Sequence, residues 1–141
     1  MRGVRHAAIP IAVTVRTAVT RTSLVWALVL SIALTPGALR PLSTSQVCRT
    51  RWSLDRRHVT LTMKRAVAAA YGVRWADRGR YEFDHLIPRE LGGADAVANL
   101  WPQRWPDAKV KDREENRLHR AVCAGQIPLG EAQERMRAWP H

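Results

Sequence analysis

The 141-residue chain lacks several features that would direct its interpretation elsewhere. It has no internal repeat and no low-complexity segment, so neither a solenoid nor a fibrous fold is indicated. Its longest apolar run, residues 24–34, has eleven residues, fewer than the roughly 20 that a helix needs to cross a bilayer. The length leaves room for one hydrophobic core, and therefore for one domain.

Acidic residues are missing from the first 54 positions, and the first 23 carry four arginines. The apolar run follows, and Thr35-Pro36-Gly37-Ala38 ends it. This order is typical of a secretory signal peptide. We therefore expect a leader over residues 1–38, cleaved after Ala33 or Ala38, a polar linker over 39–46 and a domain over 47–141. The mature protein would be secreted or extracytoplasmic, without stable membrane association, and an uncleaved leader that anchors it in the membrane is the alternative.

The formal net charge is +11. Without the four leader arginines, 19 basic residues still face 12 acidic ones. A domain this basic attracts polyanions, and nucleic acid, anionic lipid and acidic wall polymers all qualify. Charge narrows the class of partner without choosing within it.

Only two cysteines are present, Cys48 and Cys123, and both follow the expected leader. In an oxidising compartment such a pair is predicted to form a disulfide. It would close a loop of about 75 residues, for which the chain-entropy model gives roughly 4 kcal/mol.

Local patterns predict an α+β domain. Thr62 is expected to cap a helix over 63–71 that ends at Gly72. A strand over 81–87 should stop at Pro88, the Gly92-Gly93 pair marks a tight turn, and a short strand over 99–101 precedes Pro102. Two further helices are expected over 108–123, capped by Asp107, and over 129–139, whose Leu129, Ala132, Met136 and Trp139 form one core-facing side.

The order strand, Gly-Gly loop, strand, helix is that of a ββα finger, and its first strand contains an Asp-His pair. Hydrolysis of a phosphodiester needs a base for water and positive charge for the phosphorane. His85 can be the base because imidazole titrates near working pH, and Asp84 can hold a divalent cation through carboxylate oxygen. Neighbours in a regular strand point to opposite faces, so the backbone must twist or end here for both to serve one site.

Other polar residues of this region have supporting roles. The Asn99 amide can bridge backbone groups across the Gly92-Gly93 loop and so orient His85. A second metal ligand is expected from the flank of the following helix, where Asp112 is favoured and Glu115 and His119 are alternatives. Trp101 and Trp105 are interpreted as core residues rather than as platforms for base stacking.

This combination closely resembles a group of small bacterial HNH (ββα-metal, His-Me finger) endonuclease-like proteins. Its most specific part is the Asp84-His85-Leu86-Ile87-Pro88 block with the following Gly-Gly pair. The similarity covers most of residues 47–139 and includes positions 47–48, 71–72, 81–93, 99–102, 111–112, 115, 118–119, 122–125 and 132–133. At the third motif position, where members that follow the general pattern have His or Asn, this chain has Ala108.

The resemblance implies a ββα-metal finger with flanking helices and one divalent ion, for which Mg²⁺ is expected first among the divalent ions. It also implies His85 as general base, Asp84 as ligand and Asn99 as the residue that holds the loop. The expected function is that of an exported, monomeric endonuclease acting on nucleic acid, with DNA favoured over RNA. The alternative is a secreted basic protein that uses the same scaffold to bind nucleic acid or wall polymer without cutting.

Overall fold

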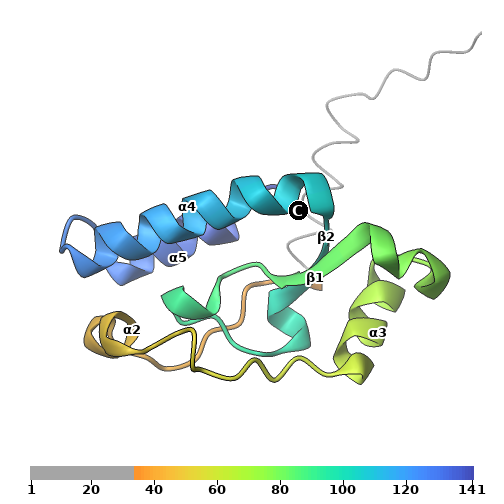
Figure 1. The fold of residues 1–141 in the computed structure, drawn as a ribbon, viewed down its shortest axis with the longest axis horizontal. Helices are drawn as coiled ribbons and strands as arrows, with labels where there is room; N and C mark the ends of the chain where they lie inside the picture. Colours follow the sequence, from red (N-terminus) through yellow and green to blue (C-terminus); the bar gives the residue numbers. More distant parts are fainter. Residues whose placement is uncertain (1–33) are drawn as a thin grey trace, which may run out of the picture.

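The computed structural model describes residues 34–141. The basic segment of the expected leader and nearly all of its apolar run lie outside these residues. The fold is α+β, as predicted, with one two-stranded antiparallel sheet and several helices (Figure 1). The α-helices are α2 (Thr44–Arg49), α3 (Leu61–Ala70), α4 (Trp105–Cys123) and α5 (Leu129–Arg137), and the strands are β1 (Tyr81–His85) and β2 (Leu100–Arg104). Short 3-10 helices span Trp75–Arg80, Arg89–Leu91 and Val97–Asn99.

The hairpin of β1 and β2 lies at the centre of the molecule. Its register pairs Phe83 with Pro102 and His85 with Leu100. The prediction that β2 would stop before Pro102 is wrong, since the strand continues through it to Arg104. A two-stranded sheet has only edge strands, where a proline is tolerated if its missing N–H would face away from the partner.

Two helix starts differ from the prediction. Thr60, not Thr62, caps α3, and its hydroxyl accepts a hydrogen bond from the Met63 amide at 3.2 Å. α4 begins at Trp105 directly after β2, so Asp107 lies in its first turn and is not the N-cap. Pro106 supports this early start, because its fixed φ suits the first helical turn and its missing N–H is not needed there.

The segment expected as leader end and linker is part of the folded unit. Thr35 is buried, and its hydroxyl bonds the Leu100 carbonyl at 3.0 Å and the Tyr71 hydroxyl at 2.6 Å. The Arg40 amide donates to the Gly92 carbonyl at 2.8 Å. A capping box between Ser43 and Gln46 then starts α2. Residues 35–46 therefore pack against the hairpin loop, which their polar composition did not indicate.

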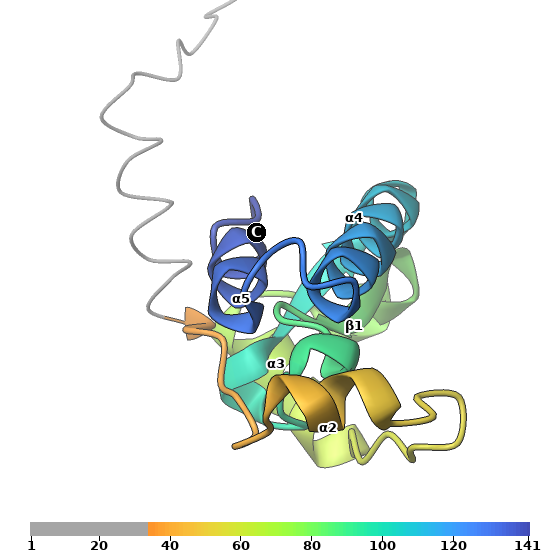
Figure 2. The ribbon, with the colours of Figure 1, turned by 90° about the vertical axis from the view of Figure 1, so that its left-hand side faces the viewer.

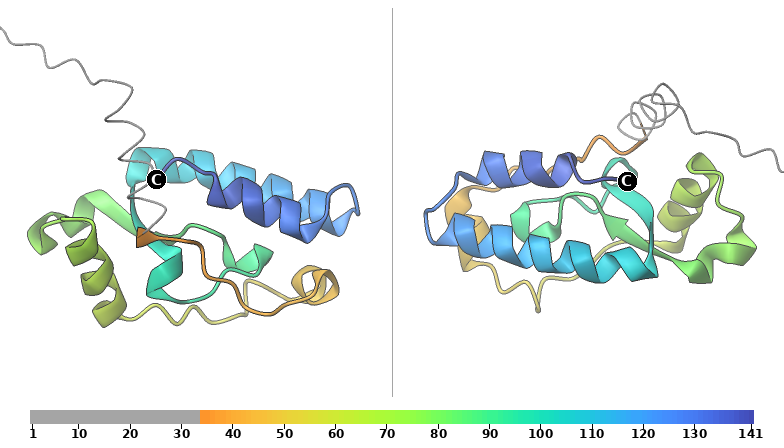
Figure 3. Two further views of the ribbon diagram at one scale, coloured as in Figure 1. Left: turned by 180° about the vertical axis from the view of Figure 1, so that it is seen from behind. Right: turned by 90° about the horizontal axis from the view of Figure 1, so that it is seen from above.

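Two apolar clusters hold the elements together. One lies between the hairpin loop, α4 and α5, and the other between α3 and the sheet. α4 and α5 lie side by side along one side of the hairpin, and α3 lies at the opposite end of the molecule from α2 (Figures 1, 2 and 3). The buried members of the first cluster are Ile87, Leu91, Leu118, Val122, Ala132 and Met136; those of the second are Val67, Ala68, Phe83 and Leu100. Leu129 and Trp139 pack against the first cluster, so the core-facing side predicted for the last helix is confirmed.

A disulfide joins Cys48 in α2 to Cys123 at the end of α4, as predicted, with their Cα atoms 5.5 Å apart. It links residues 75 positions apart and thereby holds α2 against the C-terminal end of α4. Within residues 34–141, no helix is long and apolar enough to span a membrane.

Replacing both cysteines with serine should lower the free energy of unfolding by about 2–4 kcal/mol, since the open chain regains loop entropy in the unfolded state. Urea denaturation of the wild type and of the double variant measures this difference. Two alkylatable thiols in the wild type, purified without reductant, would contradict the pairing.

Candidate active site

Asp84 and His85 line one cavity of about 230 Å³. Both residues belong to β1, as its last two positions, and Asp84 Oδ1 lies 3.9 Å from His85 Nδ1. The two side chains therefore reach the same cavity although they are neighbours in a strand. We call this space the Asp84–His85 cavity; its other lining residues are Trp52, Arg57, Pro88, Arg89, Glu90 and Glu115.

The His85 ring is buried and held by Asp95. Its Nε2 lies 2.7 Å from Asp95 Oδ1, and a carboxylate acceptor there favours the tautomer with its proton on Nε2. The lone pair of Nδ1 then lies on the side of Asp84. Burial lowers the pKa of His85 below its ordinary value, although the bond to Asp95 works against this. The ring is therefore neutral at neutral pH and able to accept a proton.

Asp95 was not predicted from the sequence. Burial alone would raise its pKa, but hydrogen bonds from the His58 amide, at 2.7 Å, and from His85 outweigh burial and lower it. Asp95 is thus a fixed negative charge behind the imidazole. The available signal was a carboxylate two residues after the Gly92-Gly93 turn.

Asn99 bridges the loop between the strands, in the manner that the sequence predicted. Its Oδ1 accepts from the Ile87 amide at 3.0 Å, and its Nδ2 donates to the Ile87 and Ala94 carbonyls at 2.9 and 3.1 Å. Gly93 permits this close approach, because a Cβ there would lie 1.8 Å from the Ile87 oxygen. The amide is fully buried, so it fixes the backbone that follows His85 and has no access to a substrate.

Lys111 is the second residue that the sequence analysis missed. Its side chain is completely buried, and its Nζ donates to Asp84 Oδ2 at 2.9 Å, to the His85 carbonyl at 2.5 Å and to Glu115. Burial would lower the pKa of Lys111, but Asp84 and Glu115 outweigh burial and raise it. The ammonium group therefore stays charged and connects α4 to the end of β1.

Among the three candidate helix ligands, only Glu115 lines the Asp84–His85 cavity. Burial, as the largest cause, raises its pKa to about 7. Asp112 is exposed, because one helical residue turns it about 100° from Lys111. His119 places its Nε2 3.6 Å from Cys123 Sγ. Ala108, at the third motif position, is buried and offers no ligand.

No group of three or more His, Cys, Asp or Glu side chains within residues 34–141 is arranged to hold a metal ion. The cavity does present two carboxylates, Asp84 and Glu115, each with one oxygen on Lys111. Mg²⁺ commonly binds one or two protein carboxylates and completes its shell with water and substrate phosphate. The donor set fits that mode of binding, and it does not form a cage made of protein alone.

Arg57 lies at the mouth of the cavity. One of its terminal nitrogens is 4.0 Å from Asp84 Oδ1, and the same nitrogen donates to the Phe83 carbonyl. Arg89 is bonded to Asp55 and lies 3.6 Å from Asp95. Of these two guanidinium groups, that of Arg57 is the more exposed, and it is therefore the one placed to meet an anion.

Comparison with known proteins finds no family model, no curated protein and no solved structure that matches this chain.

Proposed function

We propose that the chain is an exported nuclease of the HNH (ββα-metal) type, which hydrolyses phosphodiester bonds of nucleic acid, DNA in preference to RNA. The observation that carries the proposal is a buried imidazole whose Nε2 lies 2.7 Å from Asp95 and whose Nδ1 lies beside the Asp84 carboxylate, in an open cavity. The arrangement of β1, the loop bridged by Asn99, β2 and α4 supports it, since this is the order of a ββα finger.

In the proposed reaction, His85 Nδ1 takes a proton from the attacking water. Asp95 keeps the reactive nitrogen unprotonated beforehand and stabilises the imidazolium afterwards. Arg57 attracts the phosphate to the cavity mouth through its positive charge. Lys111 holds Asp84 and Glu115 together, so that their remaining oxygens are available on the cavity side.

Asp84 and Glu115 are the residues that would hold the divalent ion, Mg²⁺ first. When bound, this ion would supply positive charge to the phosphoryl oxygens as the reaction proceeds. The disulfide between Cys48 and Cys123 is consistent with an oxidising, extracytoplasmic compartment, and export to it is part of the proposal.

Nicking of supercoiled plasmid, with and without chelator, tests the proposal. We expect cleavage by the wild type that EDTA abolishes and Mg²⁺ restores. Asp84→Ala and Glu115→Ala should both weaken cleavage, and raised Mg²⁺ should partly recover it, because each variant loses one of two carboxylate ligands. Asp112→Ala, a change of the same kind on an exposed position of the same helix, is the matched control and should cleave like the wild type.

Undiminished, chelator-resistant cleavage by Asp84→Ala and Glu115→Ala would refute this site. Loss of cleavage in Asp112→Ala, with Glu115→Ala fully active, would assign the helix ligand to Asp112 instead.

A further inference from the structure

A second cavity, of about 330 Å³, adjoins the Asp84–His85 cavity. Strand β1 passes from one to the other, since Glu82 and Phe83 line the second cavity and the two residues that follow line the first. Arg57 lines both. At a strand rise of about 3.3 Å per residue, Glu82 and Asp84 are roughly 7 Å apart along the chain. A ligand group bound in the second cavity would therefore lie directly beside a ligand group bound in the Asp84–His85 cavity.

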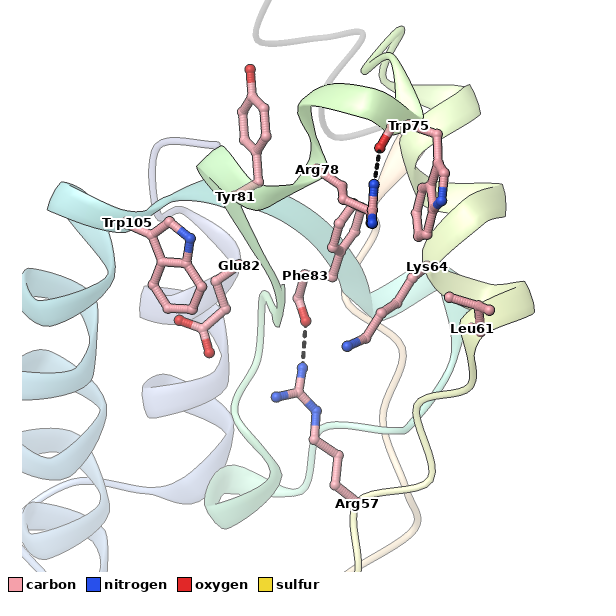
Figure 4. A pocket seen from close by; sticks show the side chains of 9 residues that line it. All are labelled: Arg57, Leu61, Lys64, Trp75, Arg78, Tyr81, Glu82, Phe83 and Trp105. Atoms are coloured by element: carbon pink, nitrogen blue, oxygen red, sulfur yellow. Dashed lines mark hydrogen bonds between the residues drawn. The ribbon is translucent and has the colours of Figure 1, made fainter.

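The walls of the second cavity combine aromatic rings with basic groups (Figure 4). The aromatic residues are Trp75, Tyr81, Phe83 and Trp105, and the basic ones are Arg57, Lys64 and Arg78. Figure 4 shows the Lys64 ammonium group directed toward the space between Glu82 and Arg57. Aromatic rings interleaved with cations are the combination with which proteins bind single-stranded nucleic acid.

Trp105 is the most informative of these residues. It was expected in the core, but it is 51% exposed at the start of α4. Its indole Nε1 donates to the Gly79 carbonyl at 3.1 Å, so the ring is held in place although much of it remains uncovered. An exposed ring with a fixed orientation offers a stacking surface without the entropy loss of ordering it first.

Two basic side chains of the second cavity, Lys64 and Arg78, are available to bind a backbone phosphate. The Arg78 guanidinium lies 5.2 Å from the centre of the Trp75 ring and donates to the Trp75 carbonyl at 3.0 Å. In the part of the chain that the structure describes, neither Lys64 nor Arg78 forms an ion pair with an acidic side chain. Their charges are therefore not neutralised by the protein.

Glu82 distinguishes a base from a phosphate as the occupant of the interior. Its carboxylate lies beneath Trp105 in Figure 4 and would repel a phosphate placed there. A carboxylate accepts hydrogen bonds only, so it suits the amino and ring N–H groups of a nucleobase. The phosphate would then lie on the side of the cavity that carries Lys64 and Arg78.

We propose that this second cavity binds a nucleobase, stacked on Trp105, from a single-stranded segment whose neighbouring phosphodiester lies in the Asp84–His85 cavity. The inference rests on the proposed function and specifies its substrate as unpaired nucleic acid. A base inside a duplex would first have to leave its stack, at a cost of a few kcal/mol. Single strands should accordingly bind and be cleaved in preference to duplex.

The test measures binding without cleavage, by fluorescence anisotropy of labelled oligonucleotides with the full-length His85→Ala protein. Adding Trp105→Ala to this protein should weaken binding of a single strand by roughly 5- to 150-fold, which corresponds to base–aromatic stacking of ~1–3 kcal/mol. Adding Trp105→Phe instead should retain most of the affinity, since a stacking ring remains. Affinity for a duplex of the same sequence should change little in either variant.

A series of oligonucleotides with one abasic position moved along the strand provides the second measurement. Affinity should drop at one position in the parent protein, and this drop should vanish in the Trp105→Ala background. Lys64→Ala should weaken intact and abasic strands equally, because it contacts the backbone. Equal loss of duplex and single-strand binding in Trp105→Ala, or no loss of either, would overturn the proposal, and melting temperatures show whether each variant is folded.

The two proposals fail in different ways. If the wild type cleaves nucleic acid but binding is independent of Trp105, the nuclease proposal stands and the base site falls. If Trp105-dependent binding of single strands is found but no cleavage, the base site stands and the chain is a binding protein.

Discussion

His85→Ala should reduce phosphodiester cleavage by roughly 10²- to 10⁴-fold, the range typical for loss of a general base, while oligonucleotide affinity is retained. The reason is that, in the proposed reaction, His85 Nδ1 takes the proton from water, whereas Arg57 and its basic neighbours attract the phosphate. Raised Mg²⁺ should not rescue this variant, in contrast to Asp84→Ala. Initial rates on a labelled oligonucleotide under saturating conditions give the comparison.

His58→Ala is the matched control. The His58 side chain is exposed, and the residue contacts Asp95 through its backbone amide rather than its imidazole. Its removal should leave the rate close to that of the wild type. Equal losses in His58→Ala and His85→Ala would mean that a histidine near Asp95 serves the structure and not the chemistry.

The pH dependence of the wild type provides a second readout of the same residue. Only the unprotonated ring can accept a proton, and burial places the pKa of His85 below the ordinary 6.5. At saturating Mg²⁺, which displaces the proton from Glu115, activity should therefore persist at pH 6.5 and fall only at lower pH, as the His85 ring becomes protonated. A fall that is already complete above pH 6.5 would contradict the role assigned to His85.

The hairpin region was predictable from sequence because its signals are local. Gly92-Gly93 marks the turn, and the bridging role of Asn99 follows from its place across that turn. The first strand ends at His85, two residues before the end at Ile87 that Pro88 predicted. The disulfide was predictable for a different reason, since two cysteines allow only one pairing. None of these inferences depends on how distant parts of the chain pack.

The features that sequence did not reveal all depend on packing. Asp95 and His85 meet only once the loop is folded, and the place of Asp95 two residues after Gly92-Gly93 does not by itself mark it as a partner of the ring. Lys111 is buried because β2 runs directly into α4, which sets the helix register that turns Lys111 toward β1. A lysine in a helix rich in charged residues is ordinarily exposed. The composition of α4 therefore predicted an exposed Lys111, whereas the side chain is buried.

The same argument applies to the helix ligand and to Trp105. Asp112 and Glu115 are both acidic residues of α4, so residue type does not distinguish them as ligands. The register of α4 brings Glu115, and not Asp112, to the Asp84–His85 cavity. Trp105 is apolar enough for a core position, yet its place at the first turn of α4 leaves it at the surface. The packing of segment 35–46 is a further feature that the sequence did not reveal. Backbone hydrogen bonds to the hairpin loop and the buried Thr35 hold this segment in place.

Lys111→Met should lower the free energy of unfolding by about 3–5 kcal/mol, the range for removing one partner of a buried charge cluster. Methionine fills much of the same space, so the loss reports on charge: Asp84 and Glu115 would be left buried without their shared cation. Urea denaturation in EDTA measures the effect. Lys109→Met, two residues away on the exposed side of α4, is the control and should stay within about 0.5 kcal/mol of the wild type.

The loss of unfolding free energy in Lys111→Met should also depend on pH. Glu115 has its pKa raised in the folded state to about 7 from 4.5, and a raised carboxyl pKa means that stability is lost as pH rises from the unfolded to the folded value. Without Lys111 the folded pKa of Glu115 rises further, so the difference from the wild type should be smaller near pH 5 than near pH 8. A deficit that is constant over this range would show that Glu115 is not part of the cluster's charge balance.

Mg²⁺ should stabilise Lys111→Met more than it stabilises the wild type. In the wild type the ammonium group already neutralises one oxygen of each carboxylate, whereas in the variant a divalent cation is the one remaining partner close to both Asp84 and Glu115. A ligand that binds only the folded state raises its stability according to its affinity, so the tighter site gives the larger shift in melting temperature. Equal shifts in Lys111→Met and in Lys109→Met would contradict this expectation and would show that the Lys111 ammonium group does not compete with Mg²⁺ for Asp84 and Glu115.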